Sequence, residues 1–205
     1  MKLDLRFTTR PLEEIWCQAV IYLVFEGPTG EQDIISGLDA KTSGYLSRLR
    51  ERGFWTGARG DTLLVASQHM IKAERILLKG LGPRGDYTSE LIGEGAEEIG
   101  TALKRMDVND IGIRVPVPSG LESEYPKQME TACVHLVKPF LESYPDGPDF
   151  LLKMVVSMDK VFMGEIESSV DSFKTHFGSK LHSTIVFERE GGSKSAGKEN
   201  TRYEI

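Results

Sequence analysis

Apolar and polar residues alternate along this chain with two different periods, which predict strands and helices in turn. Residues 3–7 alternate strictly, as in a strand with one face on a core. The run 19–25 is apolar throughout and rich in β-branched and aromatic residues, which indicates a strand buried on both faces. Two shorter strand-like runs, 61–67 and 75–81, lie too close together for a crossover helix, so we expect a hairpin-like pair. Further strand-like runs span 110–118, 150–158 and 183–188, and the run 150–158 is expected to be buried.

Four segments carry apolar residues at steps of three and four, which predicts amphipathic helices. The first covers about 34–49, with Gly53 placed as a C′ glycine, and the second covers 86–106, with Asp86 as its N-cap. The third begins near Pro126, and the fourth covers 161–177. Because strands and helices alternate, we expect an α/β fold, a three-layer α/β/α sandwich with a mixed sheet.

Domain organisation follows from length and composition. The chain has 205 residues, of which 40% are hydrophobic and 27% charged, as in an ordinary globular protein. We expect a single domain over 1–188 and a disordered polar, glycine-rich tail over 189–205.

The net charge of the chain and the length of its apolar runs indicate which kinds of partner it does not bind. The net charge of -6 disfavours a protein that coats nucleic acid. The longest apolar run is too short to span a bilayer and no secretory signal is visible, so we expect a cytoplasmic protein without membrane association. Cys17 and Cys133 each lie in an apolar run, which favours buried free thiols.

Gly80, Gly82 and Gly85 spell G-x-G-x-x-G between a strand-like and a helix-like run, the order found in dinucleotide sites. An N-cap at Asp86 would, however, occupy the N–H groups that a phosphate needs. Asp110 also lies at the start of the next strand, whereas the ribose-binding acid of such sites lies at its end. The motif therefore predicts a tight structural turn.

Other chemistry is sparse in the sequence. The four histidines show no metal-binding spacing, the cysteines lack a C-x-x-C partner, and no G-x-S-x-G elbow is present. We therefore predict no catalytic residue, no metal ligand and no cofactor. Loops at the carboxyl ends of the strands could still bind an anion or a nucleotide through N–H and hydroxyl groups. The candidate residues in those loops are Gly80, Gly82, Gly85, Ser119, Gly120 and Ser157.

One segment carries a family resemblance. Residues 57–82, "GARGDTLLVASQHMIKAERILLKGLG", and the helix-like segment before them resemble the N-terminal domain of the leucyl aminopeptidase family, peptidase family M17. The resemblance implies a macro-domain-like α/β fold and a domain without catalytic residues. The family's catalytic domain carries an Asn-Thr-Asp-Ala-Glu-Gly-Arg-Leu-like stretch, and this sequence has none. We therefore expect a domain that is not itself an enzyme.

Three functions are compatible with this resemblance. The first is a non-catalytic binding or scaffold domain that associates with itself, as a homo-oligomer, or with another protein chain. The second is a macro-like module that binds ADP-ribose or another nucleotide, although the sequence lacks the "NAAN"-like and "GVGG"-like loops of macro domains that bind ADP-ribose. The third is a subunit of a metallo-aminopeptidase whose catalytic part is a separate chain.

Overall fold

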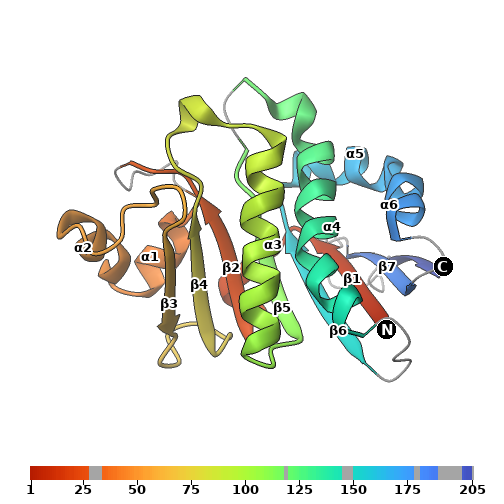
Figure 1. The fold of residues 1–205 in the computed structure, drawn as a ribbon, viewed down its shortest axis with the longest axis horizontal. Coiled ribbons are helices and arrows are strands. Elements are labelled where there is room, and N and C mark those ends of the chain that lie inside the picture. Colours follow the sequence, from red (N-terminus) through yellow and green to blue (C-terminus); the bar gives the residue numbers. More distant parts are fainter. Residues whose placement is uncertain (28–33, 118–119, 145–149, 178–180, 189–199, 205) are drawn as a thin grey trace, which may run out of the picture.

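The computed structural model describes residues 1–27, 34–117, 120–144, 150–177, 181–188 and 200–204. Over these residues the chain forms one eight-stranded sheet in the order β3-β4-β2-β5-β6-β1-β7-β8 (Figure 1). The strands are β1 (Lys2–Thr8), β2 (Ala19–Val24), β3 (Thr62–Ala66), β4 (Arg75–Gly80), β5 (Asp110–Arg114), β6 (Leu151–Ser157), β7 (His182–Glu188) and β8 (Asn200–Glu204). Neighbouring strands from β4 to β7 run parallel, and β3 and β8 pair antiparallel at the two edges. The predicted mixed sheet and the β3–β4 hairpin are thus confirmed.

Helices lie on both faces of this sheet, which confirms the predicted sandwich. The α-helices are α1 (Ser36–Lys41), α2 (Tyr45–Glu51), α3 (Ser89–Arg105), α4 (Tyr125–Ser143), α5 (Met163–Ser168) and α6 (Val170–Phe177). Short 3-10 turns are η1 (Leu12–Glu14), η2 (Arg84–Asp86), η3 (Glu122–Glu124) and η4 (Lys160–Phe162). Figure 1 shows α3 and α4 side by side across one face, with α5 and α6 beyond α4 and with α1 and α2 at the β3 side.

Two separate cores show how far each helical layer extends. The larger core joins α3, α4, α5 and α6 to one face of the sheet from β4 to β7. The smaller core joins η1, α1 and α2 to the opposite face of β2, β3 and β4. The second helical layer therefore covers only about half of the sheet.

The predicted helix over 34–49 is two helices, α1 and α2. Ser43 and Gly44 between them both have positive φ, 55° and 71°, which a continuous helix does not allow. The carboxylate of Asp39 accepts hydrogen bonds from the backbone N–H groups of Leu46 and Ser47, at 2.8 and 3.1 Å, and so satisfies the first turn of α2. Gly53, with φ of 70°, ends α2 as predicted.

The fourth predicted helix is interrupted as well, because α5 ends at Ser168 and α6 begins at Val170. The hydroxyls of Ser168 and Ser169 donate to the carbonyls of Gly164 and Glu165, at 2.8 and 3.0 Å. Hydroxyls bonded back to the preceding turn are known to bend helices, and these two lie at the interruption.

Two further expectations need correction. The N-cap of α3 is Thr88, whose side chain accepts from the N–H of Leu91 at 3.2 Å, whereas Asp86 lies in the separate turn η2. Strand β6 is only partly buried: Leu151 and Lys153 are exposed and Val155 is half-buried, whereas the other residues of the strand are buried.

The predicted disordered tail falls partly outside the described residues, at 189–199. Within the rest of that tail, Asn200–Glu204 form β8 and pair with β7, which differs from the expectation of disorder. Backbone pairing alone builds this edge strand, without a requirement for an apolar segment.

Candidate functional site at the carboxyl edge and the uncovered face

Six parallel strands, β4, β2, β5, β6, β1 and β7, end at one edge of the sheet, where ligands of α/β proteins commonly bind. Gly80 and Ser157 are the last residues of β4 and β6, and Gly82 follows β4 by two residues. Gly85 lies in η2, and Gly120 lies just before η3. Ser119 lies outside the described residues.

The turn after β4 uses its own N–H groups within the fold. Gly80 N–H donates to the carbonyl of Asp61 at 2.8 Å, Leu81 N–H to Val24 at 2.8 Å, and Gly82 N–H to Gly57 at 2.9 Å. Three successive N–H groups of this turn therefore already donate to backbone carbonyls within the fold. A phosphate at this turn would have to displace backbone hydrogen bonds.

Close packing explains why two of these positions are glycine. A Cβ atom on Gly80 would lie 2.2 Å from the carbonyl oxygen of Ala58 and 2.6 Å from that of Gly57. Gly82 has φ of 78°, a conformation that L-residues rarely adopt. Around Gly85, in contrast, no atom lies within 4 Å of such a Cβ position.

Ser157 belongs to a polar cluster at the ends of β1, β5 and β6. Its buried hydroxyl donates to the carbonyl of Arg10 at 2.8 Å and accepts from Arg114 at 3.3 Å. Arg114 also donates to the carboxylate of Asp159 at 2.6 Å. Sequence reasoning identified only Ser157, because arginines at strand ends carry no spacing signal before the strands are ordered in a sheet.

A second cluster at this edge is aromatic. The rings of Phe25 and Tyr87 meet edge to face with centroids 5.4 Å apart, and the guanidinium of Arg84 lies over Phe25 at 5.6 Å. The Tyr87 hydroxyl is buried without a hydrogen-bond partner among the described residues, and burial raises the pKa of Tyr87. On α4, the fully buried amide of Gln128 is likewise unpartnered within the described chain. Buried polar atoms without a hydrogen-bond partner are uncommon in native proteins, and a bound water or ion is one explanation for them.

The second helical layer leaves part of the sheet open. We call the side chains of β7, β1 and β6 that point away from α3 and α4 the uncovered face, because no described α-helix packs on them. Its exposed or half-buried members are His182, Thr184 and Glu188; Lys2, Asp4 and Arg6; Leu151 and Lys153. The turn η1 covers the adjacent part of β5, where a Cβ on Gly112 would lie 2.9 Å from Leu12, and Thr8 and Ser157 are buried. A shallow pocket of about 340 Å³ lies on this face and is bordered by Trp16.

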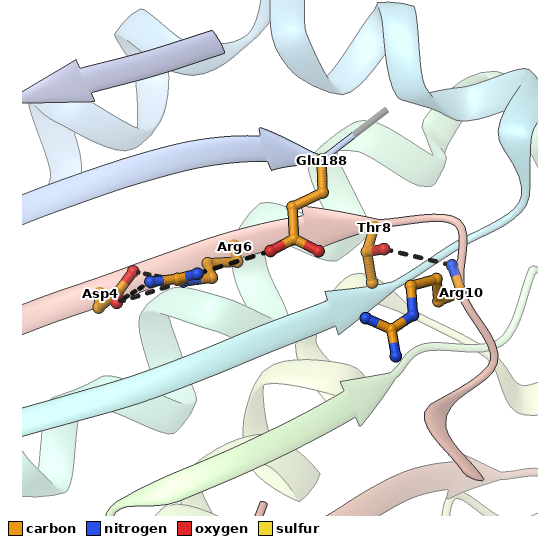
Figure 2. Close-up of polar contacts among 5 residues, drawn as sticks. All are labelled: Asp4, Arg6, Thr8, Arg10 and Glu188. Atoms are coloured by element: carbon orange, nitrogen blue, oxygen red, sulfur yellow. Dashed lines mark hydrogen bonds and ion pairs between the residues drawn. The ribbon is translucent and has the colours of Figure 1, made fainter. Parts of the chain in front are cut away.

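Charges on the uncovered face already interact with one another. Arg6 lies between Asp4, at 2.8 Å, and Glu188, at 3.6 Å, as Figure 2 shows. The hydrogen bond with Asp4 is the main reason why the pKa of Arg6 is raised. Burial raises the pKa of the Asp110 carboxyl, and the charge of Lys153 acts in the opposite direction.

A larger cavity of about 1080 Å³ opens at the amino edge of the sheet, between η1 and the β3–β4 turn. Gln68 and His69 in that turn have positive φ, 51° and 64°. Trp16, which is 78% exposed, borders both this cavity and the pocket on the uncovered face.

The described part of the chain shows neither a metal-binding cluster nor an activated thiol. No group of three or more His, Cys, Asp or Glu side chains there is placed to hold a metal ion. Cys17 and Cys133 are buried and unpaired, as predicted, and burial raises the pKa of Cys17 to about 12 and that of Cys133 further. Among the described helices, none has both the length and the apolar character needed to cross a membrane.

Comparison with known proteins places this fold in a family. The sequence profile of the cytosol aminopeptidase family, N-terminal domain, matches residues 22–135. The chain belongs to this family. The resemblance drawn from residues 57–82 is thereby confirmed.

Curated relatives of this aminopeptidase-family domain are much longer than the chain itself. A probable cytosol aminopeptidase of Pseudomonas syringae pv. tomato is 36% identical over 73 residues, 36% of this chain and 15% of the relative. A probable cytosol aminopeptidase of Geobacter sp. is 32% identical over 111 residues, 54% of this chain and 22% of the relative. The matched parts thus make up about a fifth of these two relatives.

Solved structures confirm the macro-domain-like fold of this family member. A mutant of tomato leucine aminopeptidase superposes with a TM-score of 0.64 at 14% identity, over 84% of this chain and 36% of that chain. A Trypanosoma brucei macrodomain in complex with ADP-ribose superposes with a TM-score of 0.61 at 16% identity, over 81% of this chain and 68% of that chain.

Proposed function

We propose that this cytosol aminopeptidase-family domain is a non-catalytic association module that binds another copy of itself or another protein chain in the cytoplasm. The observation that carries the proposal is the uncovered face of β6, β1 and β7. Parallel sheets are almost always covered on both faces, because both faces of their strands need burial. A parallel sheet with one open face is therefore suited to be covered by a partner.

The chemistry of the described residues supports a binding role. Both thiols are buried with raised pKa values, so neither favours the thiolate that a cysteine nucleophile needs. The polar groups at the carboxyl edge form structural bonds, such as those of Ser157 to Arg10 and Arg114. These contacts stabilise the strand ends.

The proposal is tested by two measurements on the purified protein. We expect no metal-dependent release of leucine from a chromogenic leucyl amide, with a full-length cytosol aminopeptidase as the positive control. We also expect hydrogen exchange of β1 and β6 to slow with rising protein concentration or with an added partner chain. Robust hydrolysis that a chelator abolishes would contradict the non-catalytic role.

A second candidate function is binding of a nucleotide-like ligand at the carboxyl edge. The unpartnered, buried hydroxyl of Tyr87 favours it, together with Arg84 over Phe25. One structural neighbour is described in complex with ADP-ribose. Titration calorimetry with ADP-ribose tests this function. Micromolar binding that Tyr87→Phe weakens supports it, and a flat trace for the unmodified protein rejects it.

A third candidate function is a subunit of a metallo-aminopeptidase whose catalytic part is a separate chain. It is supported by the match of residues 22–135 to the N-terminal domain of the cytosol aminopeptidase family. Co-purification with a chain that contains the family's catalytic domain would support this function, and recovery of the protein only with itself would count against it.

A further inference from the structure

We propose that the free edge of strand β3 accepts an extended segment of another protein chain as an additional strand, and that acidic residues flank the pairing part of that segment. The edge lies beyond β4 in the strand order, away from the uncovered face of β6, β1 and β7. The inference therefore goes beyond the association role proposed above and does not depend on it. It is carried by the direction of the β3 backbone groups and by cations on the neighbouring helices.

The register of β3 with β4 decides which backbone groups of β3 bond inward. Gly80 N–H donates to the carbonyl of Asp61 at 2.8 Å, and Ser67 N–H donates to the carbonyl of Glu74 at 2.9 Å. These opposed pairs flank β3 in the same antiparallel register as the strand itself. Residues of an antiparallel strand alternate between pairs that exchange hydrogen bonds and pairs that do not. The odd-numbered residues from 61 to 67 therefore bond to β4.

The even-numbered residues of β3 face the other way. Thr62, Leu64 and Ala66 lie between the bonded positions, so their N–H and C=O groups point away from β4. These outward groups make no backbone hydrogen bond to any other residue that the structure describes. An unpaired row of this kind is a template for a further strand. A segment that runs antiparallel to β3 would pair with every one of these groups.

The sequence of β3 lacks the features that commonly protect an edge strand. Thr62–Ala66 reads TLLVA and contains neither a charged residue nor a proline. Natural edge strands usually carry charges, prolines or bulges that prevent pairing with other chains. The opposite edge strand, β8, contains Arg202 and Glu204. Leu64, at the centre of β3, is 49% exposed, and an added strand would remove part of this apolar surface from water.

The helices beside β3 carry an excess of exposed cations. Lys41, Arg48 and Arg52 are exposed, and none of them forms an ion pair within the described part of the chain. Within α1 and α2, which are both fully described, Glu51 is the one exposed acid. The whole chain, in contrast, carries a net charge of -6. Because complementary charges select partners, this local excess of cations favours a segment with acidic residues.

A side-chain contact ties this basic segment to the start of β3. The carboxylate of Asp61 accepts from the N–H and the hydroxyl of Thr56, at 3.3 and 3.2 Å. Asp61 directly precedes β3, and Thr56 follows Arg52 closely along the chain. The acidic end of a segment paired with β3 would therefore lie near the cations of α2.

The position of α2 favours an extended segment over a second copy of this chain. Figure 1 shows α2 beyond β3, on the side away from β4. A second copy turned onto this edge would bring its own α1 and α2 against the same helices. An extended segment needs only the width of one strand, about 4.8 Å. Addition of a strand to a sheet edge is a common mode of peptide recognition.

The test uses a fluorescein-labelled peptide of alternating valine and threonine with glutamates at both ends. The peptide is titrated against the full chain at low salt and followed by fluorescence anisotropy. We expect saturable binding in the micromolar range. The control peptide has the same sequence with N-methyl groups on two adjacent central residues, which block both of its edges and keep its side chains and charge. We expect no binding of the control, and equal binding of both peptides would overturn strand addition.

Hydrogen exchange at single amides locates the added strand. The amides of Leu63 and Val65 bond to β4, so we expect them to exchange slowly in the free protein, whereas those of Thr62, Leu64 and Ala66 exchange fast. Saturating peptide should slow the outward amides at least tenfold and leave the inward amides unchanged. Protection at another surface in place of β3 would overturn β3 as the acceptor.

Leu64→Pro removes an outward donor without loss of a bond to β4. Proline is tolerated in a sheet at an edge where the missing N–H would face solvent. We therefore expect this variant to keep the circular dichroism spectrum of the unmodified protein and to bind the peptide at least tenfold more weakly. Val65→Pro is the contrast, because it loses a bond to β4 and should unfold at lower urea. Unchanged peptide binding by a folded Leu64→Pro protein would overturn the proposal. The N-methylated peptide tests it without any variant.

Charge variants test the acidic ends of the segment. We expect Arg52→Glu to weaken binding of the peptide at least threefold at low salt and less at high salt, because salt screens exposed charges. Arg105→Glu changes the net charge equally at an exposed position of α3, and we expect it to leave binding unchanged. Equal effects of the two variants would overturn the local role of the cations.

The remaining outcomes decide the occupant of the edge. If the unmodified protein does not bind the peptide at millimolar concentration, the proposal is overturned. Self-association that Leu64→Pro abolishes would also overturn it and make a second copy the occupant. Neither outcome bears on the association role of the uncovered face, because that role is tested by hydrogen exchange of β1 and β6.

Discussion

Replacement of Gly80 by alanine is the sharpest test of the view that the glycine-rich turn is structural. The new Cβ would lie 2.2 Å from the carbonyl oxygen of Ala58 and 2.6 Å from the carbonyl carbon of Gly57. Both neighbours are backbone atoms, so no side-chain rotation relieves the contact. The segment around residues 57–61 would have to move away from β4.

The expected cost follows from this movement. Overpacking a tight contact costs about 1–3 kcal/mol. Two backbone hydrogen bonds tie the same segment to the turn, Gly80 N–H to Asp61 and Gly82 N–H to Gly57, and each contributes about 1 kcal/mol. We expect Gly80→Ala to lower the free energy of unfolding by about 3–5 kcal/mol. With a slope of about 2–3 kcal/mol/M, the urea midpoint falls by roughly 1–2 M.

Urea unfolding followed by circular dichroism measures this shift, and the same turn supplies two controls. Gly85→Ala meets open space and has no positive φ, so we expect its free energy of unfolding to lie within about 0.5 kcal/mol of that of the unmodified protein. Gly82→Ala places alanine in a left-handed conformation, which costs about 1–2 kcal/mol. A Gly80→Ala protein that unfolds at the unmodified midpoint would refute the close approach of this turn to residues 57–58.

Two further predictions concern stability. Thr88→Ala removes the N-cap of α3 and should lower the free energy of unfolding by about 1 kcal/mol, whereas Asp86→Ala should change it by less than about 0.5 kcal/mol; the reverse order in urea midpoints would restore Asp86 as the cap. The pKa of Asp110 is raised by burial, so the folded protein loses stability as pH rises from the unfolded value near 4. Asp110→Asn should therefore unfold at higher urea than the unmodified dilute protein at pH 7 and at equal urea near pH 3. A lower midpoint at pH 7 would contradict this.

Much of the fold could be predicted from the sequence because strands and helices differ in apolar period. The run 19–25 is apolar throughout, and β2 is indeed buried at every position. Breaks inside apolar patterns were harder to predict. Residues on both sides of Ser43 and Gly44 keep a helical period, yet two left-handed conformations separate α1 from α2. Periodicity reports which side chains are buried and does not report where the backbone turns.

The candidate residues at the carboxyl edge show the same limit. The G-x-G-x-x-G spacing identifies a tight turn, but the sequence does not show which carbonyls lie against it. Only the folded structure shows that residues 57–61 lie beside the end of β4 and supply acceptors for the N–H groups of Gly80 and Gly82. Arg10 and Arg114 meet at Ser157 from strands far apart in sequence, so no spacing could reveal that cluster.

The uncovered face, in contrast, leaves a signal in the sequence. A parallel strand buried on both faces reads as a continuous apolar run, and β2 does so. Strands β1 and β6 lie in the same parallel sheet, yet Asp4 and Arg6 alternate with the apolar residues of β1, and Lys153 interrupts the apolar run of β6. The change from continuous to alternating strands coincides with the limit of the layer formed by α1 and α2. Because charged residues recur on one side of adjacent parallel strands, that side is suited to water or to a polar interface.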